Sequence, residues 1–141
     1  MAADSRPDFE VVGPGGDVKL VAEVKGSGHN PERARQQASR YAAMLNAPWA
    51  MVATPQQVQL FRWRVGTTLE EVDSLPMSRL VERYGRQNER GLYFESYVRT
   101  MLELWLRDLT LHWKAAQGPP PTIGPEEFEN AVRKGTLLVE P

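Results

Sequence analysis

Residues 7–25 read PDFEVVGPGGDVKLVAEVK, two valine-rich segments separated by a run of glycine and proline. The segments Asp8–Val12 and Val18–Lys25 have the composition of β-strands, in which branched side chains pack well. The residues between them, GPGGD at 13–17, are typical of a turn because glycine and proline adopt turn conformations readily. The stretch therefore predicts an antiparallel hairpin.

A helix and two further strands are predicted after the hairpin. Asn30-Pro31-Glu32 supplies a capping side chain, a proline at the first helical position and an acid in the first turn. The helix should end near Leu45, ahead of Asn46-Ala47-Pro48, since the residue before a proline disfavours helix. Trp49–Ala53 predicts a buried strand and Val58–Arg64 an alternating one. The order β-β-α-β-β indicates an α/β fold with a mixed central sheet.

The second half of the chain has a helical pattern. We predict helices at about Pro76–Tyr84, from about Asn88 to Ala116, and at Glu126–Lys134, with the last residues loose. Three consecutive prolines at 119–121 end the long helix. We therefore divide the chain into a core, residues 1–65, and a helical C-terminal extension, residues 66–141, which packs on the core as one compact unit.

Composition excludes several classes of protein. The chain has no cysteine, so a thiolate metal site and a disulfide framework are excluded, and we expect a cytoplasmic protein. The N-terminus has no basic segment followed by an apolar run, and no stretch approaches the roughly 18 apolar residues of a membrane span. The net charge of −1 argues against a protein that coats nucleic acid by bulk electrostatics.

Three side chains suggest chemistry at a metal. Glu23 and Lys25 lie two residues apart on a predicted strand and so share one face, although Glu-x-Lys also occurs on solvated strands. Asp8 opens the partner strand and can lie near Glu23. Two clustered carboxylates repel each other unless a hard cation such as Mg²⁺ or Mn²⁺ takes oxygen ligands from both. A nearby lysine can then orient water for phosphodiester hydrolysis.

The register of the hairpin decides whether the two acids meet. If Val12 lies opposite Val18 in a regular ladder, Asp8 lies opposite Ala22 and points away from Glu23. We therefore predict either a register shifted by one residue or a β-bulge between Asp8 and the turn.

Pro7-Asp8, then 14 residues, then Glu23-Val24-Lys25 resembles the signature of the PD-(D/E)xK nuclease superfamily. The predicted order of elements is similar to the restriction-endonuclease-like core of that superfamily. Gln37 and Tyr41, four residues apart on one face of the predicted helix, resemble the Gln-x-x-x-Tyr element of the RecB-like branch. The pattern of residues 37–64 is similar to the N-terminal nuclease domains of type I restriction motor subunits.

The resemblance implies a Mg²⁺- or Mn²⁺-dependent endo- or exonuclease that acts on DNA in restriction, repair or defence. Asp8 and Glu23 would ligate the metal, with the backbone carbonyl of Val24 as a further ligand. Lys25 would assist the attacking water and the transition state.

The sequence leaves alternatives open for the role of Gln37 and Tyr41 and for the function of the whole chain. Gln37 and Tyr41 either contact the nucleic-acid backbone or form a helix face packed on the sheet, with the hydroxyl satisfied. The whole chain is either a nuclease or a catalytically idle nucleic-acid-binding or assembly subunit with a nuclease-like fold. A purely structural dimerisation protein, with the three charges accidental, is the third possibility.

One departure from the family concerns a third acid. Many members carry a glutamate on a helix before the first strand, whereas only Met1–Arg6 precede the motif here, and Asp4 is a poor substitute. Glu10, on the strand face of Asp8, is one further candidate. Glu95, on the long helix of this chain or of a partner copy, is the other.

The long helix carries apolar residues over a broad arc, with Arg99, Glu103, Arg107 and Lys114 on the opposite side. So broad an arc predicts two apolar partners, the sheet and a second copy of the chain in a homodimer. Asp108 interrupts the arc and is expected to pair with an arginine.

Other candidates have ordinary structural explanations beside the functional ones. His29 can touch a phosphate or lie in solvent, and His112 is expected to be structural or exposed. Arg62, Trp63 and Arg64 form either a basic and aromatic contact to nucleic acid or an ordinary edge strand.

Overall fold

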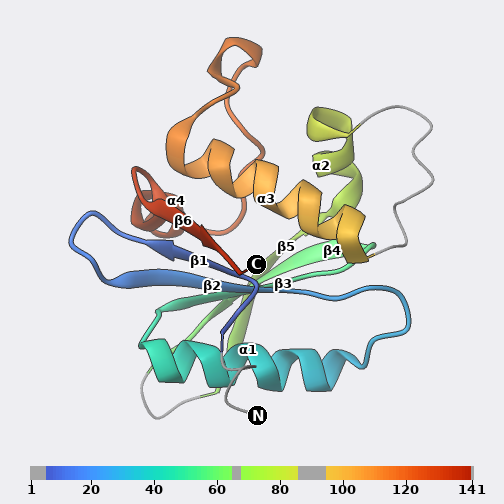
Figure 1. Ribbon diagram of the computed structural model, residues 1–141, viewed down its shortest axis with the longest axis vertical. Helices are drawn as coiled ribbons and strands as arrows, with labels where there is room; N and C mark the ends of the chain where they lie inside the picture. The colour runs from blue at the N-terminus through green and yellow to red at the C-terminus, as the bar shows by residue number, and fades with distance from the viewer. Residues whose placement is uncertain (1–5, 65–67, 86–94, 141) are drawn as a thin grey trace.

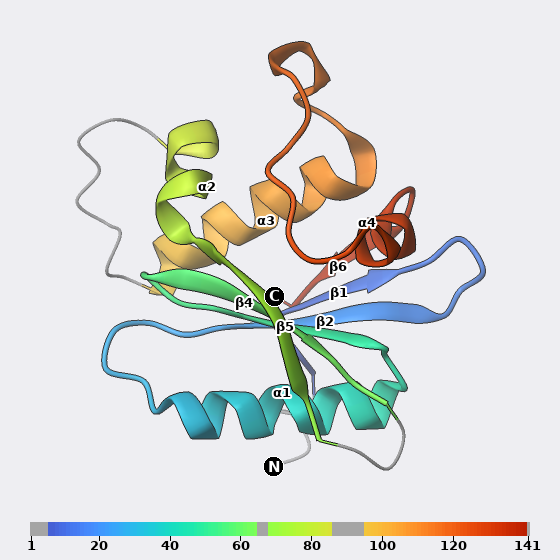
Figure 2. The ribbon, with the colours of Figure 1, turned by 180° about the vertical axis from the view of Figure 1, so that it is seen from behind.

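The computed structural model describes residues 6–64, 68–85 and 95–140. Helix α1 covers one face of a central sheet, and α2, α3 and α4 lie over the other face (Figure 1). Figure 2 shows the same three layers from behind. In the described residues the strands are β1 (Phe9–Val12), β2 (Val18–Val24), β3 (Trp49–Ala53), β4 (Gln57–Arg62), β5 (Glu70–Pro76) and β6 (Thr136–Val139). The helices are α1 (Pro31–Leu45), α2 (Met77–Tyr84), α3 (Glu95–Leu111), the 3-10 helix η3 (Ala115–Gln117) and α4 (Glu126–Val132).

The sheet is mixed, as the sequence predicts. Its six strands within the described ranges follow the order β5-β4-β3-β2-β1-β6. The strands β2 and β3, which α1 connects, are parallel, and each other neighbouring pair is antiparallel. The first part of the chain therefore has the predicted order β-β-α-β-β within an α/β fold.

The hairpin of β1 and β2 contains the predicted irregularity. Val12 pairs with Val18, but Val11 pairs with Leu20, so the register shifts by one residue between these two positions. Phe9 consequently pairs with Ala22, and the next residue towards the N-terminus, Asp8, comes level with Glu23. The bulge turns both acids to the same face of the sheet.

Helix α1 begins and ends where local chemistry predicts. The side chain of Asn30 accepts hydrogen bonds from the backbone N–H groups of Glu32 and Arg33, which have no partner inside the helix. Asn46 closes the helix in the left-handed conformation at φ 54°. The buried face of α1, including Ala34, Ala38 and Tyr41, packs on the sheet.

The predicted helical extension, residues 66–141, contains the strands β5 and β6 in addition to its helices. β5 pairs with β4, and β6 pairs with β1, so this half supplies an edge strand on each side of the sheet. The sequence of β5, EEVDSLP, does not alternate, and residues 70–74 are exposed. Backbone pairing with β4, rather than burial of its own side chains, therefore makes this segment a strand.

The C-terminal residues form β6 instead of lying loose. A Cβ atom at Gly135 would lie 2.7 Å from the Val11 side chain and 2.9 Å from the Val12 carbonyl oxygen, so glycine permits the close approach to β1. The backbone N–H of Glu140 donates to the carbonyl of Asp8 at 2.9 Å. The end of the chain therefore lies beside the first acid of the candidate site.

Helix α3 packs on the sheet, as predicted. Val98, Leu102 and Trp105 are fully buried in the same apolar cluster as Phe9 and other strand residues. The helix ends at Leu111, before the predicted Ala116, and the following residue has a positive φ of 55°. The predicted start at Asn88 lies outside the described residues. None of the helices in the described ranges is both long and apolar enough to cross a membrane.

Asp108 has the arginine partner that its burial requires. It is 0% exposed, and it accepts a hydrogen bond from Arg83 Nε at 3.1 Å. The Tyr84 hydroxyl donates to the same carboxylate oxygen. Burial, followed by this carboxylate, raises the pKa of the tyrosine above its usual range. The pair joins α2 to α3 on the face of the sheet opposite α1.

Candidate functional site

A cavity of about 420 Å³ lies where β1 begins and β2 ends. Residues just before β1, at the end of β2 and just after it, on α1 and in the first turn of α3 line it. They include seven residues that the sequence analysis names as candidates, Asp8, Glu23, Val24, Lys25, Gln37, Tyr41 and Glu95, together with Arg6 and Glu140. The fold therefore brings the first and the last described residues of the chain to one cavity.

The two acids of the motif are held through the backbone of the hairpin. The N–H of Asp8 donates to Glu23 Oε2 at 3.2 Å, and the N–H of Val24 donates to Asp8 Oδ2 at 2.8 Å. Each acid therefore accepts a hydrogen bond from the strand that carries the other. This reciprocal arrangement fixes both carboxylates beside the same cavity.

Glu23 has an altered affinity for its proton. Glu23 is only 3% exposed. This burial, followed by the negative charge of Asp8, raises the pKa of Glu23 from 4.5 to about 7. The ammonium of Lys25 and the hydrogen bond from Asp8 act in the opposite direction. Burial and the neighbouring carboxylate therefore both favour the protonated form of Glu23.

A short chain of polar contacts leads from Glu23 to α1. Lys25 Nζ lies 3.7 Å from Glu23 Oε1 and donates to Gln37 Oε1 at 2.6 Å. Gln37 Nε2 in turn lies 3.5 Å from the hydroxyl of Tyr41, a long contact, while the tyrosine is 4% exposed against the sheet. Gln37 thus positions the lysine. Tyr41 packs against the sheet and also lines the cavity.

Arg99 is a site residue that the sequence analysis assigns only to the polar side of the long helix. Its Nη1 donates to Asp8 Oδ1 at 2.9 Å. Its Nη2 donates to the backbone carbonyl of Glu140, and the guanidinium lies 5.1 Å from the centroid of the Phe9 ring. Helical periodicity marks Arg99 as polar but cannot show that this side of α3 meets the start of β1.

The two candidates for a third acid differ in position. Glu10 pairs with Val21 in the hairpin and does not line the cavity. Glu95 lines the cavity from the first turn of α3, close to Gly26, where an added Cβ atom would lie 3.4 Å from Glu95 Cβ. In the described parts of the chain, however, no three Asp, Glu or His side chains are grouped to hold a metal ion.

The remaining candidates lie outside this cavity. The ring of His29 contacts the carbonyl of Gly26 at 3.2 Å, and His112 follows the end of α3. The guanidinium of Arg62 lies 4.7 Å from the centroid of the Trp49 ring and forms an ion pair with Glu127, so this arginine has partners within the fold. Trp63 packs against the apolar cluster under α1, whereas Arg64 is exposed beside a second hollow of about 490 Å³.

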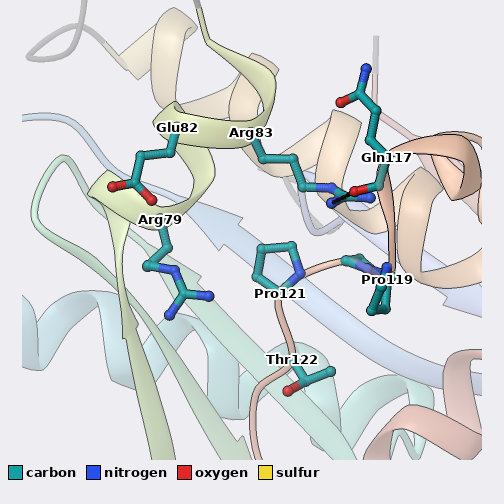
Figure 3. A pocket seen from close by; sticks show the side chains of 8 residues that line it. Arg79, Glu82, Arg83, Gln117, Pro119, Pro121 and Thr122 are labelled. Carbon is teal, nitrogen blue, oxygen red and sulfur yellow. Dashed lines mark hydrogen bonds between the residues drawn. The ribbon is translucent and has the colours of Figure 1, made fainter.

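A larger cavity, of about 560 Å³, lies between α2 and residues 117–122. Figure 3 shows Arg79 and Arg83 on the α2 side and the proline segment opposite them. Arg83 is held by Asp108 and by the backbone carbonyls of Lys114, Gln117 and Gly118. The lining of this cavity includes none of the predicted catalytic residues.

The chain was compared with protein-family models, curated proteins and solved structures, and no significant match was found in any of the three comparisons.

Proposed function

We propose that this chain is a Mg²⁺-dependent nuclease that hydrolyses phosphodiester bonds of DNA, on a core of the PD-(D/E)xK type. The observation that carries the proposal is the shared cavity of Asp8, Glu23 and Lys25, which lie where β1 begins and β2 ends. Acid, acid and lysine at one cavity are the groups that metal-assisted hydrolysis requires.

The donor set fits a hard divalent cation. Asp8 and Glu23 would supply carboxylate oxygens, the ligands that Mg²⁺ and Mn²⁺ prefer. The N–H of Val24 donates to Asp8 Oδ2 at 2.8 Å. In an antiparallel ladder the N–H and the carbonyl of one residue point to the same neighbouring strand, so the carbonyl of Val24 points to the side of Asp8 as well. That carbonyl is therefore a reasonable additional ligand. Bound metal would supply charge to activate water and to stabilise the phosphorane-like transition state.

The side chains of the chain itself have distinct roles in this proposal. Lys25 holds its ammonium at the cavity, where it orients the attacking water and stabilises negative charge that develops on the phosphate. Gln37 fixes that ammonium through the 2.6 Å hydrogen bond. Tyr41, which also lines the cavity, would contact the substrate backbone.

A cleavage assay tests the proposal. Linear, circular and single-stranded DNA are incubated with Mg²⁺ or Mn²⁺ and with wild-type protein, Lys25→Ala or Lys19→Ala. Lys19 is a matched control because it lies on β2, the strand that leads to Lys25, and forms its ion pair with Asp17 in the turn. We expect wild type and Lys19→Ala to cleave, and Lys25→Ala to lose activity. Equal cleavage by all three proteins would indicate a contaminating nuclease and overturn the proposal.

A catalytically idle nucleic-acid-binding or assembly subunit is the second candidate. The ion pair between Arg99 and Asp8 favours it, because an internal guanidinium can satisfy an acid that no longer binds metal. An idle subunit should bind DNA without saturable Mg²⁺ binding and without cleavage. Metal titration of the wild type therefore separates the two candidates.

We also propose that the chain forms a homodimer and that the two copies meet at the end of α3 and the residues just after it. Much of the apolar arc of this helix is buried on the sheet, but Leu111 is 63% exposed and Trp113 47% exposed. Light scattering coupled to size-exclusion chromatography should give twice the monomer mass for wild type and the monomer mass for Leu111→Glu. A monomeric wild type would remove this part of the proposal.

A further inference from the structure

Arg99 is fixed by three contacts that meet at the candidate site. One end of its guanidinium donates to Asp8 Oδ1 at 2.9 Å, and the other donates to the backbone carbonyl of Glu140. The same group lies over the ring of Phe9. An arginine held in this way, with its side chain 28% exposed, is part of the architecture around Asp8 and not a solvated surface charge.

Arg99 changes the charge of the site. Asp8 and Glu23, when ionised, contribute two negative charges, and Lys25 and Arg99 contribute two positive ones. Lys25 Nζ lies 3.7 Å from one acid and Arg99 Nη1 lies 2.9 Å from the other. These four charges cancel at the two acids, whereas divalent cations bind most tightly to carboxylates whose charge is not balanced. Arg6, Glu95 and Glu140 line the rest of the cavity.

Arg99 also donates a hydrogen bond to a carboxylate oxygen that a metal ion at this site would bind. Asp8 Oδ1 accepts from Arg99, and Asp8 Oδ2 accepts from the N–H of Val24 at 2.8 Å. Both oxygens thus already have a donor. A metal at Asp8 must share an oxygen with one of these donors or displace it, and the side chain is far easier to displace than a backbone N–H of the sheet.

We propose that Arg99 is an internal cation that competes with the divalent metal for Asp8 and so sets the metal concentration at which the site is loaded. This inference rests on the proposed function, because it concerns the same metal site. Mg²⁺ binding weakens the contact between Arg99 and Asp8, and removal of the arginine charge tightens Mg²⁺ binding.

Calorimetric titration of the full chain with Mg²⁺ alone tests the competition. Arg99→Gln removes the charge, and Arg107→Gln is the matched control because Arg107, on the same helix, pairs with Glu103 one turn away. We expect Arg99→Gln to bind Mg²⁺ about tenfold more tightly than wild type, and Arg107→Gln to stay within about twofold. Equal or weaker binding by folded Arg99→Gln would overturn the inference.

A second measurement uses the unaltered protein, in case Arg99→Gln does not fold. The guanidinium N–H signals of Arg99 are followed by nuclear magnetic resonance during Mg²⁺ addition, with those of Arg107 as internal reference. We expect the Arg99 signals to shift as the metal binds and the Arg107 signals to remain in place. Unchanged Arg99 signals at saturating Mg²⁺ would rule out the competition.

Cleavage assays run beside the titration separate this inference from the proposed function. Tighter Mg²⁺ binding by Arg99→Gln without DNA cleavage by either protein supports the competition and overturns the nuclease. Cleavage with equal Mg²⁺ affinities supports the nuclease and overturns the competition. Absence of saturable Mg²⁺ binding in both proteins overturns both.

Discussion

The backbone N–H of Asp8 donates a hydrogen bond to the side-chain carboxylate of Glu23 at 3.2 Å. The main chain of one acid therefore holds the side chain of the other. The contact depends on the register shift between Val11 and Val12, because an unshifted ladder would place Glu23 on the opposite face from Asp8.

The first prediction concerns the stability of the metal-free protein at different pH values. The pKa of Glu23 is raised from 4.5 to about 7, so the folded state binds this proton more tightly than the unfolded state does. Ionisation of Glu23 therefore lowers the free energy of unfolding. The penalty is absent well below pH 4.5, grows as pH rises, and is complete above about pH 7.

Glu23→Gln removes this penalty. We expect the variant to exceed wild type in free energy of unfolding by up to about 3 kcal/mol at pH 8, with a much smaller difference at pH 5. Urea denaturation without divalent metal measures both values. Glu10→Gln, on the same hairpin but outside the cavity, should show little difference at either pH. A Glu23→Gln variant less stable than wild type at pH 8 would contradict the prediction.

The second prediction concerns metal binding. Asp8→Asn and Glu23→Gln should each abolish saturable Mn²⁺ binding, measured from the paramagnetic resonance signal of free Mn²⁺, while the protein stays folded. Glu10→Gln should bind like wild type. If either substitution at the cavity unfolds the protein, its acid is structural, and the interpretation of the pair as metal ligands is wrong.

Local signals explain which parts of the fold could be predicted from sequence. The turn at 13–17, the cap at Asn30 and the apolar run Trp49–Ala53 each specify an element within a few residues, and the structure confirms the elements that they predict. The register shift was predictable for another reason. Only a shifted hairpin places Asp8 and Glu23 on one face.

The missed features depend on contacts between distant segments. β5 and β6 have weak strand patterns and become strands because β4 and β1 offer unpaired backbone groups. The role of Arg99 was missed for the same reason. Its partner Asp8 lies 91 residues away in the chain, and only the packing of α3 across the sheet brings the two together.

The third prediction concerns the buried pair between α2 and α3. Arg83→Met leaves the carboxylate of Asp108, whose side chain is 0% exposed, without its cation and should lower the free energy of unfolding by about 3–5 kcal/mol. Arg107→Met breaks the more exposed pair with Glu103 and should cost less than about 1 kcal/mol. Urea denaturation of both variants measures the difference, and similar losses would show that the buried pair contributes no more than a surface one.

The last prediction tests Gln37 as a positioning residue. Its side-chain oxygen accepts a hydrogen bond from Lys25 Nζ at 2.6 Å, whereas the neighbouring Gln36 is exposed on α1. Gln37→Ala leaves the ammonium free to move, so kcat for DNA cleavage should fall by about tenfold to hundredfold with little change in KM. The free energy of unfolding should fall by only about 1 kcal/mol, the usual contribution of one hydrogen bond.

Gln36→Ala is the matched control, since it makes the same chemical change one residue away. It should leave kcat, KM and stability close to the wild-type values. A fall in kcat for Gln37→Ala no larger than for Gln36→Ala would remove the positioning role. A rise in KM at constant kcat would instead assign Gln37 to contact with the nucleic-acid backbone, because loss of a contact made equally in the ground and transition states weakens substrate binding without slowing the chemical step.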